Sequence, residues 1–194
     1  MAVVDGVVAG QAGGVARAEE FFATCPAGLE PLLADELASF GIAGTRPLRG
    51  QVAFRGTLAD AYRACLWSRM ASRVMLVLAR VDASDADALY EGVSGVAWED
   101  HLPLGATFAV DAHGTNDELR NTQFVALRAK DAIVDRMLAR RGSRPQVSVE
   151  APDVQVACRI SRDRATLAID LTGEPLFKRD VTAGRVPLPL LRAD

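Results

Sequence analysis

The longest periodic stretch of the chain runs from Leu119 to Arg141, with the sequence LRNTQFVALRAKDAIVDRMLARR. Apolar residues recur there every three or four positions, the spacing that places side chains on one face of a helix. Asn121 or Thr122 can cap the start of this helix, and Gly142 can end it. We therefore expect a long amphipathic helix whose apolar face consists of Phe124, Leu127, Ile133, Val134, Met137 and Leu138.

Lys130 interrupts this apolar face, because it lies one turn from both Leu127 and Val134. A charge among apolar side chains is costly unless it pairs with an opposite charge or reaches water. The residue therefore has two interpretations. It is either a structural lysine that snorkels or pairs with a carboxylate, or a cation that faces a bound polyanion.

The segments before this helix alternate between short strand patterns and helical patterns. Arg49-Gly50 is typical of a tight hairpin turn between two strands. The order strand–helix–strand–strand–helix–strand is that of a ferredoxin-like α+β unit, in which two helices cover one face of an antiparallel sheet. The predicted strands are 21–25, 45–48, 51–55 and 72–81, and the predicted helices are 29–40 and 58–67.

The remaining segments extend the α+β pattern with antiparallel or mixed sheets. A helix is predicted over 85–96 with Ser84 as its cap. Residues 1–20 have no period and are expected to form a mobile tail, whereas 172–194, rich in Gly and Pro, are expected to be an exposed linker. The further predicted strands are 107–112, 147–149, 154–160 and 165–171, of which the last two form a half-buried hairpin.

The cysteines and histidines form no metal or disulfide pattern. Cys25, Cys65 and Cys158 are isolated, which is typical of reduced thiols in a cytoplasmic protein. His101 and His113 have no partner at ligand spacing, so no metal site is expected. The chain also lacks a signal-peptide pattern and any run of about 18 uncharged apolar residues, and we expect a cytoplasmic protein without membrane contact.

Catalytic motifs are missing from the sequence. Gly92 and Gly95 lie inside a helical segment, without the strand-to-helix turn that binds a nucleotide cofactor. An enzyme site would have to combine Asp111, His113 and Lys130, and their spacing does not support one. We therefore expect no catalytic residue and no cofactor in this chain, which has the composition of a binding module.

Charge is distributed unevenly along the chain. Residues 1–119 carry 8 Lys and Arg against 16 Asp and Glu, whereas residues 120–194 carry 14 against 9. The two balances, −8 and +5, sum to the net charge of −3. Such asymmetry indicates either a side that faces a polyanion or an excess spread over unrelated faces.

Several long stretches of the chain resemble one bacterial family. They are FFATCPAGLEPLLADEL at 21–37, LWSRMASRVMLVL at 66–78, GATFAVDAHGTNDELRNTQFVALRAKDAIVDRM at 105–137, RPQVSVEAPDVQV at 144–156 and ATLAIDLTGEPLFKR at 165–179. In this order they resemble the N-terminal half of the 23S ribosomal RNA guanine-N2 methyltransferases. Members of that family often carry the label N6-adenine-specific DNA methylase.

The resemblance implies a fold, a function and a partner. It implies a ferredoxin-like domain at 21–59, whose last strand at 72–81 is shared, interleaved with a THUMP domain at 60–172, followed by a linker at 173–194. THUMP domains bind structured RNA, here 23S rRNA, and position it for an S-adenosylmethionine-dependent methyltransferase domain in the same chain or a partner. By this resemblance, the motifs of that domain would lie beyond Asp194. Phe177-Lys178-Arg179 also departs from the histidine-containing run that is usual after Leu176.

RNA binding would depend on Lys and Arg contacts to phosphates, which give salt-sensitive affinity but little sequence choice. Arg120 and Asn121 stand where a helix N-terminus offers N–H groups to an anion. A structural or protein-interaction module without direct RNA contact is the alternative function. The candidate RNA-binding residues are Arg120, Asn121, Arg128, Lys130, Arg141, Arg144, Lys178 and Arg179.

Overall fold

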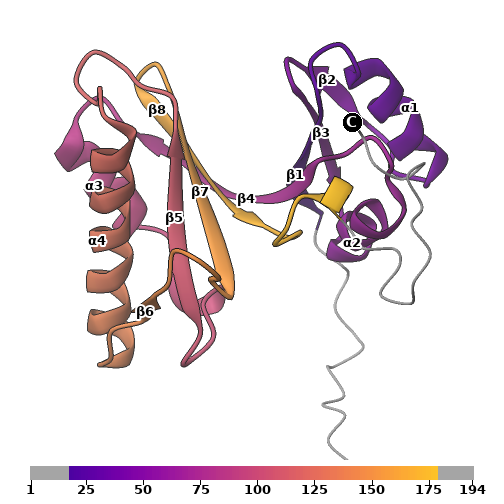
Figure 1. Cartoon of the computed structure of the whole chain (residues 1–194). Helices are drawn as coiled ribbons and strands as arrows, with labels where there is room; N and C mark the ends of the chain where they lie inside the picture. Colours follow the sequence, from indigo (N-terminus) through magenta and orange to yellow (C-terminus); the bar gives the residue numbers. More distant parts are fainter. Residues whose placement is uncertain (1–17, 179–194) are drawn as a thin grey trace, which may run out of the picture.

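The computed structural model describes residues 18–178, and its strands form one eight-stranded sheet. The strand order is β2 (Arg46–Leu48), β3 (Gln51–Gly56), β1 (Glu19–Thr24), β4 (Arg73–Asp82), β8 (Arg164–Asp170), β7 (Val154–Ser161), β5 (Thr107–His113) and β6 (Gln146–Val147). Figure 1 shows the helices on the outer side of each half, so that the helix-free face of the sheet is turned inward between the halves. The α+β class predicted from the sequence is confirmed.

The first half has the predicted ferredoxin-like order, and helices α1 and α2 cover one face of its sheet. Apolar residues of alternating strand positions, such as Phe21 and Phe54, stack beneath these helices with ring centroids 5.3 Å apart. The carboxylate of Glu30 accepts hydrogen bonds from the backbone N–H groups of Gly28 and Gly50, both at 2.7 Å, and so fixes the β2–β3 turn to the start of α1. The elements are β1 (Glu19–Thr24), α1 (Glu30–Ser39), β2 (Arg46–Leu48), β3 (Gln51–Gly56), α2 (Leu58–Trp67) and β4 (Arg73–Asp82).

The second half packs helices α3 and α4 on one face of strands β5, β7 and β8. A Cβ atom on Gly92 of α3 would lie 2.5 Å from the Cβ of Val81, so only glycine lets α3 approach β4 this closely. This contact gives Gly92 a packing role between α3 and β4. The elements are α3 (Ala86–Ser94), the 3₁₀ turn η1 (Trp98–Asp100), β5 (Thr107–His113), α4 (Thr122–Arg141), β6 (Gln146–Val147), β7 (Val154–Ser161), β8 (Arg164–Asp170) and the 3₁₀ turn η2 (Leu176–Lys178).

Strand β4 belongs to both halves. Its start pairs antiparallel with β1, and almost its whole length pairs antiparallel with β8. The register shifts between Val77 and Ala79, where β4 leaves β1 and continues into the second half. A bulge of this kind bends a strand and increases its twist. The two halves therefore share one sheet that turns at β4.

The buried face of α4 differs from the predicted one. Its members are Val125, Ala129, Ala132, Ile133 and Met137, whereas Leu127 is 56% exposed and Phe124 and Leu138 are also exposed. The small side chains of Ala129 and Ala132 let α4 lie close to its neighbours. The prediction counted only large apolar residues, and it therefore placed the buried face of α4 too far around the helix. Lys130 consequently lies at the flank of the packed face instead of its centre.

Several element ends also differ from the expectation. Asp85, not Ser84, caps α3, because its carboxylate accepts from the N–H groups of Asp87 and Ala88. The predicted strand 147–149 is only Gln146–Val147, paired parallel with β5. Glu19 and Glu20, expected in the tail, belong to β1, and the rest of that predicted tail up to residue 17 lies outside the described residues.

The expected exposed segment after β8 begins with a buried anchor. Leu176 in η2 is buried in the same core as Ala61 and Ala64 of α2, and its N–H donates to the carbonyl of Ser72 at 2.8 Å. Residues 172–178 are therefore packed onto the first half. The predicted linker from residue 179 onward lies outside the described residues.

Candidate nucleic-acid interface

Arg128, one of the predicted RNA-binding residues, is held between the two helices of the second half. Its guanidinium donates to the Ala86 carbonyl at 3.1 Å and to Asp87 at 2.6 Å, and it lies 4.4 Å from the centre of the Tyr90 ring. The Tyr90 hydroxyl in turn donates to Asp135 at 2.7 Å. These contacts give Arg128 a structural task in fixing α3 to α4, whatever else it binds.

The predicted residues at the ends of α4 are also engaged locally. Asn121 caps the helix by accepting from the N–H groups of Gln123 and Phe124 at 2.8 and 3.2 Å. These two N–H groups are therefore not free to bind an anion, which differs from the expectation for this helix N-terminus. Arg120 donates to the Asp117 carbonyl at 2.5 Å, and Arg141 donates to the carbonyls of Leu102 and Glu99. Arg144 is exposed.

The remaining predicted residues do not converge on one site. Lys130 pairs with the neighbouring Asp131 at 2.7 Å on α4, and both interpretations of this lysine stay predictions. Lys178 pairs with Glu174 at 3.4 Å in the first half, and Arg179 lies outside the described residues. RNA contact by this set stays a prediction.

A catalytic combination of Asp111, His113 and Lys130 is not assembled. Asp111 and His113 contact each other at 3.2 Å on the helix-free face, because the residues between and beside them in β5 point toward the helices. Lys130 belongs to α4 on the opposite side of the sheet. Among residues 18–178, no cluster of three or more His, Cys, Asp or Glu side chains could hold a metal ion.

Exposed arginines on the helix-free face were missed by sequence reasoning. They include Arg46, Arg55, Arg80 and Arg159, and also Arg164, opposite Asp82 at the start of β8. Strand alternation was the available signal, since Arg159 stands between Cys158 and Ile160, which are buried beneath the helices. Which strands meet was not visible in the sequence, and only the sheet order brings these arginines to one face.

Glu20 lies among these arginines. Its two carboxylate oxygens accept from Arg80 at 2.7 and 2.5 Å, and Arg55 is its cross-strand partner on β3. The hydrogen bonds from Arg80, with Coulomb attraction from Arg80, Arg55 and Arg46, hold the pKa of Glu20 below its ordinary value against partial burial. The carboxylate is therefore charged at neutral pH and offsets one of these arginines.

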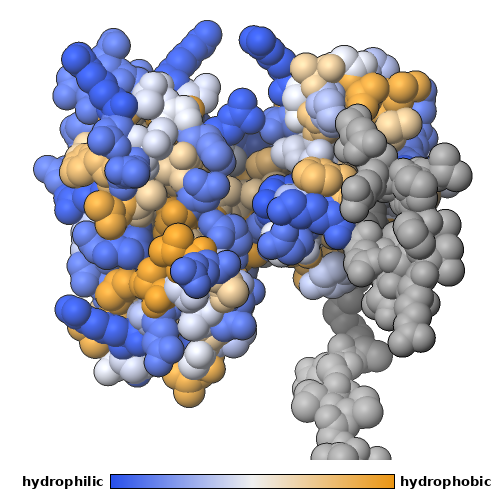
Figure 2. Space-filling model, in the orientation of Figure 1, coloured by the Kyte–Doolittle hydropathy of each residue, from blue (hydrophilic) through white to orange (hydrophobic). Residues whose placement is uncertain are grey.

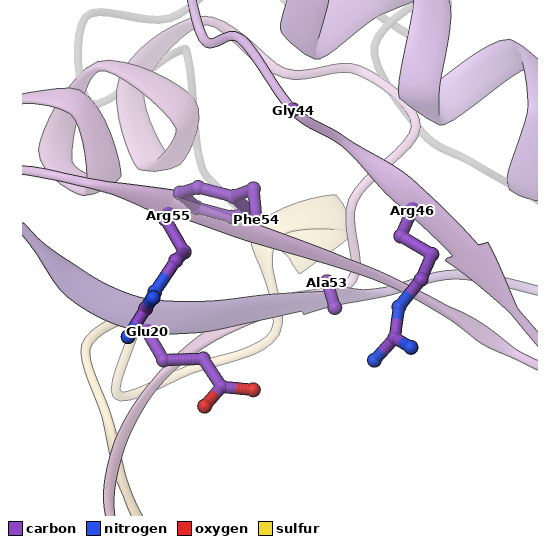
Figure 3. Close-up of a pocket in the computed structure, with 6 residues that line it drawn as sticks. All are labelled: Glu20, Gly44, Arg46, Ala53, Phe54 and Arg55. Atoms are coloured by element: carbon purple, nitrogen blue, oxygen red, sulfur yellow. The ribbon is translucent and has the colours of Figure 1, made fainter.

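A surface hollow of about 400 Å³ opens beside this group. It is lined by Glu20, Gly44, Arg46, Ala53, Phe54 and Arg55. Figure 3 shows the side chains of Arg46, Arg55 and Glu20 extending to the same side of the strands, with the short Ala53 side chain between the two arginines. The hollow thus presents cationic walls with room for a polar group of a ligand.

A second surface feature is an apolar stripe on α2. Leu58, Tyr62 and Leu66 follow each other at four-residue spacing, Trp67 adjoins them, and all four are exposed, Leu66 by 70%. Figure 2 shows that hydrophobic residues also gather on the second half, over α4 and the neighbouring β6 segment, where Leu127 and Val147 are exposed. No helix within residues 18–178 has the length and hydropathy of a membrane span.

Comparison with known proteins identifies both halves. A family model described as the RlmL ferredoxin-like domain matches residues 20–75, and the THUMP domain model matches residues 83–170. Ribosomal RNA large subunit methyltransferase K/L of Syntrophotalea carbinolica is 46% identical over 171 residues, covering 88% of this chain and 24% of that protein. The chain therefore spans about a quarter of the length of this curated relative.

Solved structures share the arrangement of the two halves. A predicted N6-adenine-specific DNA methylase from Listeria monocytogenes is 31% identical with a TM-score of 0.77, covering 90% of this chain and 46% of that one. The complex of SMU.472 with SAH is 28% identical with a TM-score of 0.75, covering 84% and 44%.

The fold and the matches define the chain as a ferredoxin-like domain joined to a THUMP domain through one sheet. Its two halves belong to the RlmL ferredoxin-like and THUMP domain families, and the chain is similar to about a quarter of ribosomal RNA large subunit methyltransferase K/L. The resemblance inferred from the sequence is thereby confirmed. The domain limits inferred with it, 21–59 and 60–172, stay predictions.

Proposed function

We propose that this chain is the RNA-binding portion of an S-adenosylmethionine-dependent 23S rRNA guanine-N2 methyltransferase. It would hold structured rRNA in position for a catalytic domain that residues 1–194 do not contain. The observation that carries this proposal is the THUMP match over residues 83–170, together with 46% identity to a ribosomal RNA methyltransferase.

The expected chemistry is recognition of the RNA backbone. Arginine presents a planar fork of N–H donors that matches a phosphate, and each neutralised phosphate releases a counterion, so affinity falls as salt rises. S-adenosylmethionine would be bound by the catalytic domain, and the solved relative in complex with SAH supports that assignment for the longer protein. The chain itself would position RNA and transfer no methyl group.

A titration of the whole chain with a labelled RNA hairpin tests this function. We expect weak binding that prefers RNA over a DNA duplex of the same length and weakens between about 50 and 200 mM KCl. Incubation with radiolabelled S-adenosylmethionine and rRNA should give no methylated product. The proposal is wrong if RNA is not preferred at low salt even when a relative's methyltransferase domain is added, and methylation by this chain alone would contradict its non-catalytic part.

A second function, contact with a further protein domain, is favoured by the apolar stripe on α2. Exposed apolar patches on folded domains commonly mark protein-binding surfaces. The stripe formed by Leu58, Tyr62, Leu66 and Trp67 adjoins the core in which Leu176 of η2 is anchored, so a domain that follows η2 in a longer protein would start beside it. We propose an apolar surface of the methyltransferase domain as its occupant.

The variant Leu66→Ser/Trp67→Ser tests this contact. Both side chains are exposed, so the free energy of unfolding of this chain should change by about 0.5 kcal/mol or less. Association with a separately added methyltransferase domain, measured by calorimetry, should weaken at least tenfold, a loss of about 1.4 kcal/mol. Leu127→Ser on α4 serves as the matched control, and equal losses for both variants would argue against a specific surface on α2.

A further inference from the structure

We propose that the helix-free face where the two halves meet binds the phosphate backbone of the RNA. We name it the junction patch and define it by Arg46, Arg55, Arg80, Arg159 and Glu20. This inference rests on the proposed RNA-binding function and assigns it to a surface. The site would take a sugar–phosphate strand at the turn of the sheet.

The junction patch is concave. Arg159 on β7 donates to the side-chain oxygen of Gln51 on β3 at 3.2 Å, although four strand steps separate β3 from β7 in the sheet. Four steps of a flat sheet would cover about 19 Å, more than the two side chains can bridge. The sheet must therefore curl toward its helix-free side, and Figure 1 shows the two halves inclined around that face. A curled face can surround a convex strand of RNA.

The charges of the junction patch do not balance. The patch has four guanidinium groups and one carboxylate. Arg80, Arg55 and Arg46 attract Glu20, which directs both of its oxygens to Arg80. Among residues 18–178, no carboxylate lies within ion-pair distance of Arg46 or Arg55, and Arg159 bonds to a neutral amide. Like charges gathered this way repel one another, and a bound anion removes that cost.

The cations elsewhere behave differently. On the helix side, Arg128 and Arg136 are paired with Asp87 and Glu99 and donate to backbone carbonyls. Those groups hold helices together. The side chains of Arg46 and Arg55 form no ion pair or hydrogen bond with the part of the chain that the structure describes, and they border a hollow of about 400 Å³. The contrast favours the junction patch as the surface on which cations are available to phosphates.

The patch is suited to the backbone and not to stacked bases. Phe22, between Glu20 and the end of β1, is the aromatic side chain that strand alternation places on this face of the first half, and it is half-buried. Base stacking requires an exposed ring. Recognition here would therefore depend on charge and shape, with little dependence on sequence.

The test measures the affinity of the whole chain for a labelled RNA hairpin as a function of salt. In Arg46→Ala/Arg55→Ala, the slope of log K against log salt should fall by about 2, close to one per lost phosphate contact, and binding should weaken about tenfold or more at low salt. Arg46→Lys/Arg55→Lys keeps the charge and should retain most of the slope. The control Arg69→Ala/Arg140→Ala removes two exposed charges from the helix side and should leave the slope unchanged.

Glu20→Gln gives a result of opposite sign. Removing the anion increases the positive charge of the junction patch, so RNA should bind about two- to fivefold more tightly. A structural role for Glu20 predicts unchanged or weaker binding. This variant leaves all four arginines in place, and it therefore tests the patch even if the double alanine variant folds poorly.

The outcomes separate this inference from the function on which it rests. If the unaltered chain binds RNA but Arg46→Ala/Arg55→Ala binds with the same slope and affinity, the junction patch is excluded and the proposed function stands. If the unaltered chain shows no preference for RNA, the function itself is wrong. Loss of binding in Arg120→Ala/Arg144→Ala alone would assign RNA to the helix side and overturn the junction patch.

Discussion

The two halves of the molecule use the same sheet but fix their helices by different means. In the second half, ion pairs and backbone bonds fasten α4 to its neighbours, as in the bidentate pair of Arg136 with Glu99 at 2.7 and 2.8 Å. In the first half, the helices are held mainly at their ends. Glu30 binds the β2–β3 turn, and Glu36 accepts from Ser68 and from the N–H groups after α2.

This difference indicates which side chains of each half are available to bind a partner. In the second half, Arg128 and Arg141, which the sequence suggested as ligands for RNA, are occupied in holding α4 to its neighbours. The first half needs few such links. Its surface carries the apolar stripe on α2 and two sheet arginines, Arg46 and Arg55, that have no ion-pair partner within residues 18–178. We therefore expect binding surfaces where polar and apolar side chains are not needed to hold helices in place.

The largest expected effect tests whether the halves are one folding unit. Ile133→Ala removes a fully buried side chain from α4 and should lower the free energy of unfolding by about 2–5 kcal/mol, whereas Leu127→Ala on the exposed side should cost about 0.5 kcal/mol or less. Because β4 joins both cores, the loss should appear in both halves together.

The two tryptophans report the halves separately. Trp98 is buried in the second half and Trp67 lies on α2 of the first, so Trp67→Phe and Trp98→Phe backgrounds each leave one fluorescence signal for urea unfolding. The Ile133→Ala shift should be equal in both signals. A shift confined to Trp98 would show that the first half unfolds independently and that the shared strand does not couple the two.

A smaller effect is expected from acid at the ion pair of Glu99 with Arg136 in the second half. The hydrogen bonds from Arg136 lower the pKa of Glu99 from its ordinary value of 4.5 to about 2. A lowered carboxyl pKa contributes stability that is fully present above about pH 4.5 and is lost as pH falls through about 2. Glu99→Gln should therefore be less stable than the unaltered chain at pH 7, with the difference shrinking steadily below pH 4.5.

Urea unfolding at a series of pH values measures this difference. Glu150→Gln, which removes one exposed negative charge from a loop, is the control for the change in net charge. The difference in free energy of unfolding between Glu99→Gln and the unaltered chain could stay constant down to pH 2. That result would mean that the charge of Glu99, paired with Arg136, does not stabilise the folded state.

The sequence predicted the elements well wherever one face of a strand or helix was clearly marked. The alternation of Val156, Cys158 and Ile160 against Leu167 identified the β7–β8 hairpin, and the register pairs Cys158 with Leu167 as that pattern requires. Gly142, with φ of 70°, ends α4 as expected, and Asn121 caps it. These features depend on neighbours in the chain, which a sequence displays directly.

Features that depend on distant partners were not accessible. The face of α4 was misassigned because Ala129 and Ala132 pack closely only in the presence of the sheet, and their small side chains carry a weak hydrophobic signal. The pairing of Arg136 with Glu99 joins residues 37 positions apart. The meeting of Arg159 with Gln51 spans 108 positions and depends on how the whole sheet curls.

The double pairing of β4 also governs the order in which the protein can form during synthesis. Once residue 82 has been made, the first half has every strand of its own sheet, but the other edge of β4 has no partner. That partner is β8, which is made much later. Arg164 follows its partner Asp82 by 82 positions, and Asp170 follows its partner Met75 by 95 positions. An open strand edge is a template for pairing with other chains. Between the synthesis of β4 and that of β8, the free edge of β4 can therefore pair with strands of other chains.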